Sequence, residues 1–165
     1  MPGSEEGVRE RKFAVVERHL HSVPAASEPG VPGRIRVVLA DDHLPLRRTL
    51  RRLLEGEKDL EVIGEAGDFE SALRQVRRYG PDVLVLDLRM ADGSIAERIR
   101  RLREVSRTTQ IVVITMEQNP LFAEQTRQAG AIGFVLKDTA DIELCDAVRD
   151  AARSVRYESP RVRQP

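Results

Sequence analysis

Residues 83–87 are Val-Leu-Val-Leu-Asp, four apolar residues followed by a carboxylate. A short apolar run without polar alternation is typical of a strand that is covered on both faces of a parallel sheet. Similar runs occur on either side, at residues 35–40, 111–114 and 134–136. A weaker run at 60–66 is interrupted by Glu61, Gly64 and Glu65, which suits an edge strand. The sequence therefore predicts five strands.

Each interval that follows a run carries apolar residues at helical spacing, with capping or turn residues at its ends. Asp68, Asn119 and Thr139 are predicted N-caps, and Gly56 and Gly130 are predicted to end two of the helices. The last helix is expected to bury one apolar face, composed of Ile142, Cys145, Val148 and Ala152. Four arginines lie opposite the leucines of the first helix, and we interpret them as a solvated face: Arg47, Arg48, Arg51 and Arg52.

This alternation of strands and helices predicts an α/β fold, a three-layer sandwich with helices on both faces of a five-stranded parallel sheet. Residues 34–154 are predicted to form this domain. Residues 1–33 are expected to be an N-terminal extension, in which an amphipathic segment at 5–21 precedes a linker rich in proline and glycine. Residues 155–165 are expected to be a C-terminal tail.

Polar side chains stand where four of the five runs end: Asp41 and Asp42 after the first, then Asp87, Thr115 and Lys137. Because ligand sites of open α/β sheets form at the carboxyl ends of the strands, we expect these side chains to meet. Three carboxylates would repel one another, and a cation relieves that repulsion. Lys137 supplies one positive charge, and Mg²⁺ suits a set of oxygen ligands. Such a site can bind phosphate and form an acyl phosphate on a carboxylate.

Composition excludes several classes of protein. Lys plus Arg equals Asp plus Glu, at 27 each, which is unlike a nucleic-acid-binding chain. The single cysteine cannot form an internal disulfide, and no apolar run approaches the length of a membrane span. We expect a cytoplasmic protein that contacts neither DNA nor membrane. A nucleotide-binding enzyme is disfavoured because no glycine-rich loop follows the first run.

Four stretches together resemble the receiver domain of two-component response regulators: Val-Val-Leu-Ala-Asp-Asp-His at 37–43, Val-Leu-Val-Leu-Asp-Leu-Arg-Met at 83–90, Val-Ile-Thr-Met at 113–116 and Gly-Phe-Val-Leu-Lys-Asp at 133–138. The residues in these stretches are most similar to the NarL/FixJ-like branch of that family. The resemblance covers residues 35–154 and implies a flavodoxin-like, CheY-like fold with strand order 2-1-3-4-5.

The resemblance also implies roles for individual residues. It makes Asp87 the phosphoacceptor and places Mg²⁺ at Asp41, Asp42, Asp87 and the backbone carbonyl of Arg89. These roles imply a phosphorelay protein that receives its phosphoryl group from a histidine kinase and is not itself a turnover enzyme. An aspartyl-phosphate phosphohydrolase is disfavoured because Arg89, two residues after Asp87, cannot serve as a general acid.

Three further residues take roles from the same resemblance. Thr115 and Lys137 would contact the phosphoryl group, and Phe134 matches the rotating switch aromatic. Phosphorylation would then change the surface of the fourth helix, fifth strand and fifth helix, and so control a downstream partner or self-association. From their positions two residues beyond the strand ends, we also expect Arg89 and Glu117 to pair across the site.

The sequence departs from the family in two places. Ala91 and Ile95 stand where the family often has proline and glycine, so we expect a differently shaped loop after Asp87. Only about a dozen residues follow the fifth helix, whereas this branch usually continues into a helix-turn-helix domain, so we expect no DNA-binding domain here. Two alternatives stay open: an interaction module regulated without phosphorylation, and a truncated transcriptional regulator without its DNA-binding domain.

Overall fold

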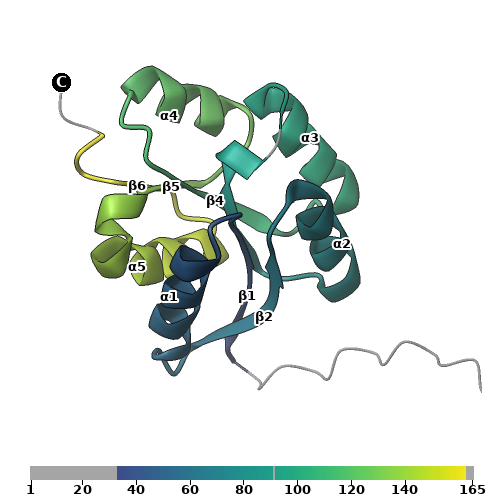
Figure 1. Ribbon diagram of the computed structural model, residues 1–165, viewed down its shortest axis with the longest axis vertical. Coiled ribbons are helices and arrows are strands. Elements are labelled where there is room, and N and C mark those ends of the chain that lie inside the picture. The colour runs from purple at the N-terminus through teal and green to yellow at the C-terminus, as the bar shows by residue number, and fades with distance from the viewer. Residues whose placement is uncertain (1–32, 91, 163–165) are drawn as a thin grey trace, which may run out of the picture.

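The computed structural model describes residues 33–90 and 92–162, so the expectations for residues 1–32 lie outside the described residues. Figure 1 shows a central sheet surrounded by helices. Its elements, in chain order, are β1 (Ile35–Ala40), α1 (Leu44–Glu55), β2 (Leu60–Ala66), α2 (Phe69–Tyr79), β3 (Val83–Asp87), η1 (Leu88–Met90), α3 (Ile95–Val105), β4 (Gln110–Thr115), α4 (Pro120–Gln128), β5 (Gly133–Leu136), η2 (Lys137–Thr139), α5 (Ala140–Ala152) and β6 (Tyr157–Glu158).

The sheet is parallel throughout and has the order β2-β1-β3-β4-β5-β6. The predicted α/β class and the order 2-1-3-4-5 are confirmed, and β2 lies at an edge as expected. The prediction of five strands is wrong, because β6 adds a sixth strand beside β5. This strand has two residues and lies within the segment predicted to be a tail. It carries no apolar run, so hydrophobic patterning could not reveal it.

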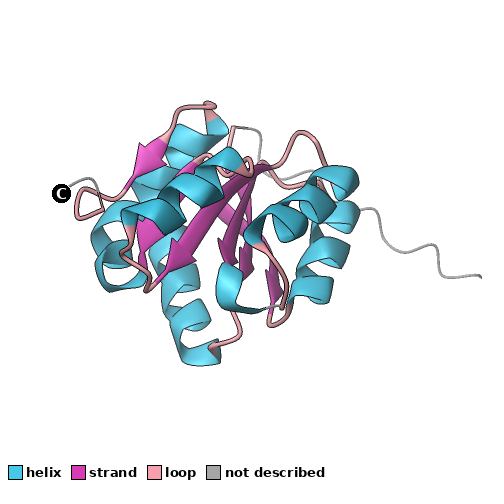
Figure 2. Cartoon of the chain, turned by 90° about the horizontal axis from the view of Figure 1, so that it is seen from above, coloured by secondary structure: helices cyan, strands magenta, loops and turns pink. Residues whose placement is uncertain are grey.

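The helices form two layers, one on each face of the sheet (Figure 2). Alternate residues of the buried strands point to opposite faces. Val38, Leu84 and Val113 pack with α2, α3 and α4. Val37, Val85 and Val112 pack with α1 and α5. Both faces of the central strands are therefore buried from solvent, which is why residues 83–86 contain no polar side chain.

The predicted caps are confirmed at two helices. The side chains of Asp68 and Asn119 accept hydrogen bonds from the backbone N–H groups of Ser71 and Leu121. Thr139 precedes α5, but its side chain makes no capping bond and donates instead to the Leu136 carbonyl. The N-cap position of Thr139 is therefore confirmed, but its hydroxyl does not cap the helix because it turns back toward β5.

The expected apolar face of α5 is shifted. Leu144, Ala147, Val148 and Ala151 are buried, whereas Ile142 is 76% exposed and Cys145 is only partly buried. The interpretation of the α1 arginines as solvated holds for Arg48 and Arg52, and in part for Arg51, whose side chain is 42% exposed.

Candidate functional site

The carboxyl ends of four neighbouring strands bring the predicted side chains together. Asp41 and Asp42 follow β1, Asp87 ends β3, Thr115 ends β4 and Lys137 follows β5. Because β1 lies between β2 and β3, the chain reverses its direction of winding at this point, where open sheets leave a crevice. The expected cluster is present, and the fold alone accounts for its assembly.

Lys137 lies between the two buried carboxylates of the cluster. Its Nζ is 2.7 Å from Oδ2 of Asp41 and 2.7 Å from Oδ2 of Asp87, to which it donates a hydrogen bond. Asp41 and Asp87 are each 2% exposed, and the lysine side chain is 11% exposed. Burial lowers the pKa of the Lys137 ammonium, but the contacts with Asp41 and Asp87 outweigh that effect and raise it above its usual value. Lys137 therefore stays protonated at neutral pH beside Asp41 and Asp87.

Backbone hydrogen bonds fix the other oxygens of the site. The N–H of Arg89 donates to Oδ1 of Asp87 at 2.9 Å, and the N–H of His43 donates to Oδ1 of Asp41 at 2.7 Å. The Thr115 hydroxyl oxygen accepts from the N–H of Glu117 at 3.1 Å. Since this bond uses an oxygen lone pair, the Thr115 hydroxyl hydrogen can be donated to a ligand.

The three aspartates form an acidic pocket with one open side. One oxygen from each of Asp41, Asp42 and Asp87 lies within 4.8 Å of the others. Asp42 is exposed, while Asp41 and Asp87 are buried. With Lys137 the four side chains carry a formal charge of minus two. The donor set is oxygen only and one side faces solvent, which fits Mg²⁺, a cation that keeps several of its waters.

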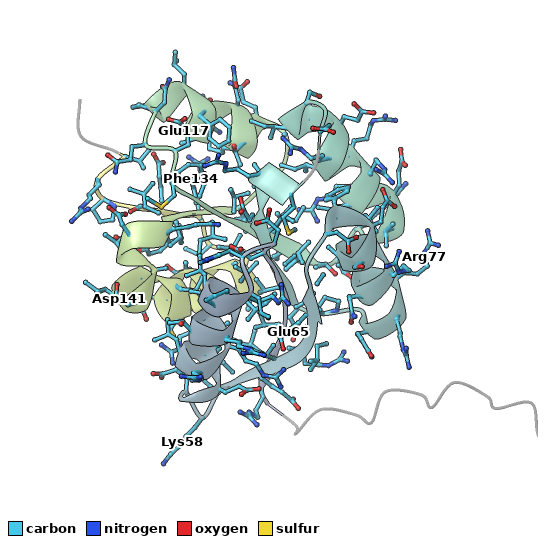
Figure 3. The ribbon with its side chains drawn as sticks, viewed as in Figure 1. Lys58, Glu65, Arg77, Glu117, Phe134 and Asp141 are labelled. Carbon is cyan, nitrogen blue, oxygen red and sulfur yellow. The ribbon has the colours of Figure 1, made fainter. Side chains whose placement is uncertain are left out.

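Phe134 is the predicted switch residue. It is 5% exposed, and its ring meets that of Phe122 edge to face, with centroids 6.2 Å apart. In Figure 3, Phe134 and Glu117 both lie toward α4, which carries Phe122. Phe134 is thus buried against α4, in the strand next to the one that ends at Thr115.

The expected pairing of Arg89 with Glu117 is wrong for the described residues. Both side chains line a cavity of about 370 Å³ with Thr115, Met116 and Phe122, but they form no ion pair with each other. The Glu117 carboxylate instead accepts a hydrogen bond from the N–H of Asn119 at 2.9 Å. That bond ties the Glu117 carboxylate to the backbone of its own loop.

Two arginines that sequence patterning did not select hold the loops of the site. Arg47 of α1 is 15% exposed, donates to the Asp41 carbonyl at 2.5 Å and pairs with Glu65. The expectation of a solvated face is wrong here because β2 places Glu65 within reach. Arg51 likewise pairs with Glu55 and Glu65.

The second arginine is Arg98 of α3, which is 9% exposed and donates to the Leu88 carbonyl next to Asp87. Burial lowers the pKa of its guanidinium, an effect that the carboxylates of Asp87 and Asp92 oppose. A glycine with positive φ, Gly93, and the Ser94 cap of α3 shape the same loop. The loop after Asp87 is therefore held in place by Arg98, Gly93 and Ser94.

Comparisons with known proteins agree with this geometry. The family model for the response regulator receiver domain matches residues 37–149. A probable transcriptional regulatory protein NarL from Mycobacterium tuberculosis is 35% identical over 129 residues, which cover 78% of this chain and 60% of that protein. The uncharacterized transcriptional regulatory protein YxjL from Bacillus subtilis is 36% identical over 120 residues, 73% of this chain and 55% of that protein. The chain thus spans little more than half the length of these curated relatives.

Solved structures give the same result. The signal receiver domain of the putative response regulator NarL from M. tuberculosis superposes with a TM-score of 0.68 at 35% identity, covering 74% of this chain and 98% of that one. A LuxR-family two-component response regulator from Aurantimonas sp. SI85-9A1 superposes with a TM-score of 0.73 at 33% identity, covering 78% and 92%.

The fold and the acidic pocket thus define a receiver domain of the two-component class. The chain belongs to the response-regulator receiver domain family, and its relatives place it in the NarL/LuxR group. Within residues 33–90 and 92–162, no helix has the length and apolar character needed to cross a membrane.

Proposed function

We propose that Asp87 accepts a phosphoryl group from a histidine kinase and that the domain signals through protein contacts. The observation that carries this proposal is the position of Lys137, whose Nζ lies 2.7 Å from Oδ2 of both Asp87 and Asp41. A buried carboxylate at a strand end is suited to bind a phosphate and its metal ion when it accepts a hydrogen bond from a lysine and lies beside an exposed carboxylate.

In the proposed reaction, a carboxylate oxygen of Asp87 attacks the phosphorus of a phosphohistidine. The P–N bond breaks and its electrons leave on the imidazole, which takes up a proton from solvent. Lys137 neutralises one phosphoryl oxygen, and the Thr115 hydroxyl donates to another. The domain accepts and slowly loses this group, so it is a phosphoprotein switch and not a turnover enzyme.

Asp41, Asp42, Asp87 and the carbonyl of Arg89 would hold Mg²⁺. When bound, the ion supplies the positive charge that the phosphoryl oxygens need and that Lys137 alone does not provide. These three carboxylates and one carbonyl would still leave positions open for water in the octahedral shell of Mg²⁺.

The output would be a change in the surface of α4, β5 and α5. Thr115 would move toward the phosphoryl group and Phe134 would follow, altering contacts with a downstream protein or a second copy. This would take place in the cytoplasm, where a histidine kinase presents its phosphorylated residue. Sedimentation with and without beryllofluoride would test for self-association.

Incubation with phosphoramidate, a small P–N donor, and Mg²⁺ tests the acceptor. We expect one phosphoryl group by intact mass in the wild-type chain and none in Asp87→Asn. Asp82→Asn is the matched control, because Asp82 immediately precedes β3, at the end opposite Asp87. EDTA should abolish labelling. Wild-type yield from Asp87→Asn would rule out this acceptor, and undiminished labelling in EDTA would rule out the metal.

A further inference from the structure

The edge of β5, which carries Phe134, is occupied by a segment of the same chain. Residues 155–162, here called the strap, follow α5 and run beside β5 as β6 (Figure 1). The N–H of Tyr157 donates to the Ile132 carbonyl at 3.1 Å, and the N–H of Ser159 donates to the Phe134 carbonyl at 2.9 Å. The strap is therefore bonded directly to the backbone of the predicted switch residue.

The end of the strap is buried in the same core as Phe134. A turn closed by a hydrogen bond from the N–H of Val162 to the Ser159 carbonyl folds the chain back toward α4. Val162 is 2% exposed and belongs to the apolar cluster that contains Phe134 and Ala123. Val162 thus packs in the same core as the Phe134 ring, and a new position of that ring requires this core to repack.

A third contact ties the strap to the phosphoacceptor side. Arg161 pairs with Asp138 at 2.7 Å, and Asp138 directly follows Lys137. Both partners are partly exposed, so this pair adds little stability. Its position matters more, because a lysine that moves with a bound phosphoryl group shifts the residue that holds Arg161.

The packing between the strap and the switch is also incomplete. A cavity of about 10 Å³ is lined by Ala123, Phe134, Tyr157 and Glu158, among others. This volume is close to that of one water and far too small for a phenyl ring. If Phe134 turns away, the ring leaves a larger void behind it, and the strap loses part of its support.

We propose that the strap is a built-in competitor for the output surface. It covers the edge of β5 while Asp87 is unphosphorylated, and phosphorylation releases it. This inference rests on the proposed function and adds the identity of the segment that covers the edge of β5 in the resting state, which is the strap, residues 155–162 of the chain itself. A two-residue strand is held by few bonds, so a shift of Phe134 is enough to open it, as expected for elements of low local stability.

Linkage requires the coupling to act in both directions. If phosphorylation weakens the docking of the strap, loss of docking favours phosphorylation by the same factor at equilibrium. Val162→Asp places a charge in the buried position and should undock the strap. Val155→Asp makes the same change at a residue of the strap that is 48% exposed, and it is the matched control. Arg161→Ala is a milder variant that leaves the core intact.

Amide hydrogen exchange of the full chain, measured by NMR with and without beryllofluoride and Mg²⁺, tests the proposal. We expect the amide exchange rates of Ser159 and Val162 to rise about tenfold or more with beryllofluoride. The amide chemical shifts of Thr115 and Glu117 should change under the same conditions. Val162→Asp should show fast exchange without beryllofluoride and should bind beryllofluoride more tightly than the wild type. Val155→Asp should match the wild type, and Arg161→Ala should lie between.

The outcomes separate the two proposals. If the chemical shifts of Thr115 and Glu117 change but the exchange rates of Ser159 and Val162 do not, the proposal of strap release is wrong and the phosphorylation proposal stands. No response anywhere, together with no phosphorylation of Asp87, overturns both. If Val162→Asp does not fold, Arg161→Ala and the wild-type comparison still decide: equal exchange with and without beryllofluoride in both chains refutes release.

Discussion

Replacing Asp42 by asparagine should stabilise the protein without Mg²⁺ and remove its response to Mg²⁺. The three aspartate oxygens lie within 4.8 Å of one another, and Lys137 offsets only part of their repulsion. Two unit charges at that distance repel by about 1 kcal/mol in water and about 3–4 kcal/mol at an effective dielectric of 20. Asp42 is exposed, so the lower part of that range applies, and we expect a gain of about 1–2 kcal/mol.

Thermal unfolding in EDTA and in Mg²⁺ measures both effects. A gain of 1–2 kcal/mol should raise Tm by roughly 3–8 °C for a domain of this size. For the wild type, Mg²⁺ at ten times its Kd should add about 1.4 kcal/mol, and for Asp42→Asn it should add almost nothing. The advantage of the variant in EDTA should therefore shrink or disappear in Mg²⁺.

The control is Asp141→Asn, a change of the same kind at an exposed acid in the first turn of α5 that is not one of the three clustered aspartates (Figure 3). It removes a charge that favours the helix N-terminus, so it should lower Tm slightly and leave the Mg²⁺ response intact. A lower Tm for Asp42→Asn in EDTA, or equal stabilisation of wild type and variant by Mg²⁺, would refute this account of the pocket.

Three other outcomes are expected. Arg149 holds the pKa of Asp59 at about 2, below its usual value. Arg149→Ala should therefore lower the free energy of unfolding by roughly 1 kcal/mol at neutral pH, and this loss should fade as the pH falls from about 4 to about 2. Equal acid-unfolding curves for the wild type and the variant would contradict this. Arg89→Ala and Glu117→Ala should each speed loss of the phosphoryl label by opening the cavity beside Thr115, and because the two side chains form no ion pair in the described structure their effects should add; unchanged decay in both would exclude the idea. Specific DNA binding is not expected from a chain with 27 acidic and 27 basic side chains, and a gel shift that persists at moderate salt would overturn this.

Most of the architecture follows from hydrophobic patterning because the sheet is buried on both faces. Val83–Leu86 has no solvent-facing position, so the run is continuous and visible. The site is predictable for a related reason. Strand order and parallel direction fix where the runs end, and Asp87, Thr115 and Lys137 are the residues at those ends.

Other features depend on contacts that no local pattern encodes. The burial of Arg47 requires Glu65, which reaches it from the neighbouring strand β2. A cationic side chain on a helix usually lies in solvent, so the sequence pattern alone predicts that Arg47 is exposed. The predicted α5 face is wrong for another reason. The helix packs against the sheet from its first residue, the buried Ala140, and Ile142 lies two residues from both Ala140 and Leu144, which places it on the opposite side of the helix.

Arg98 and β6 hold backbone atoms on two sides of the site. Where the family often has proline and glycine after the phosphoacceptor, this chain has Ala91 and Ile95, and Arg98 holds the Leu88 carbonyl from α3. At the other side of the site, β6 holds the Phe134 carbonyl from the edge of the sheet. Both devices act on backbone atoms next to residues that the proposed reaction moves. The acidic pocket accounts for the proposed chemistry, and we expect these two contacts to influence how easily the rest of the domain responds to it.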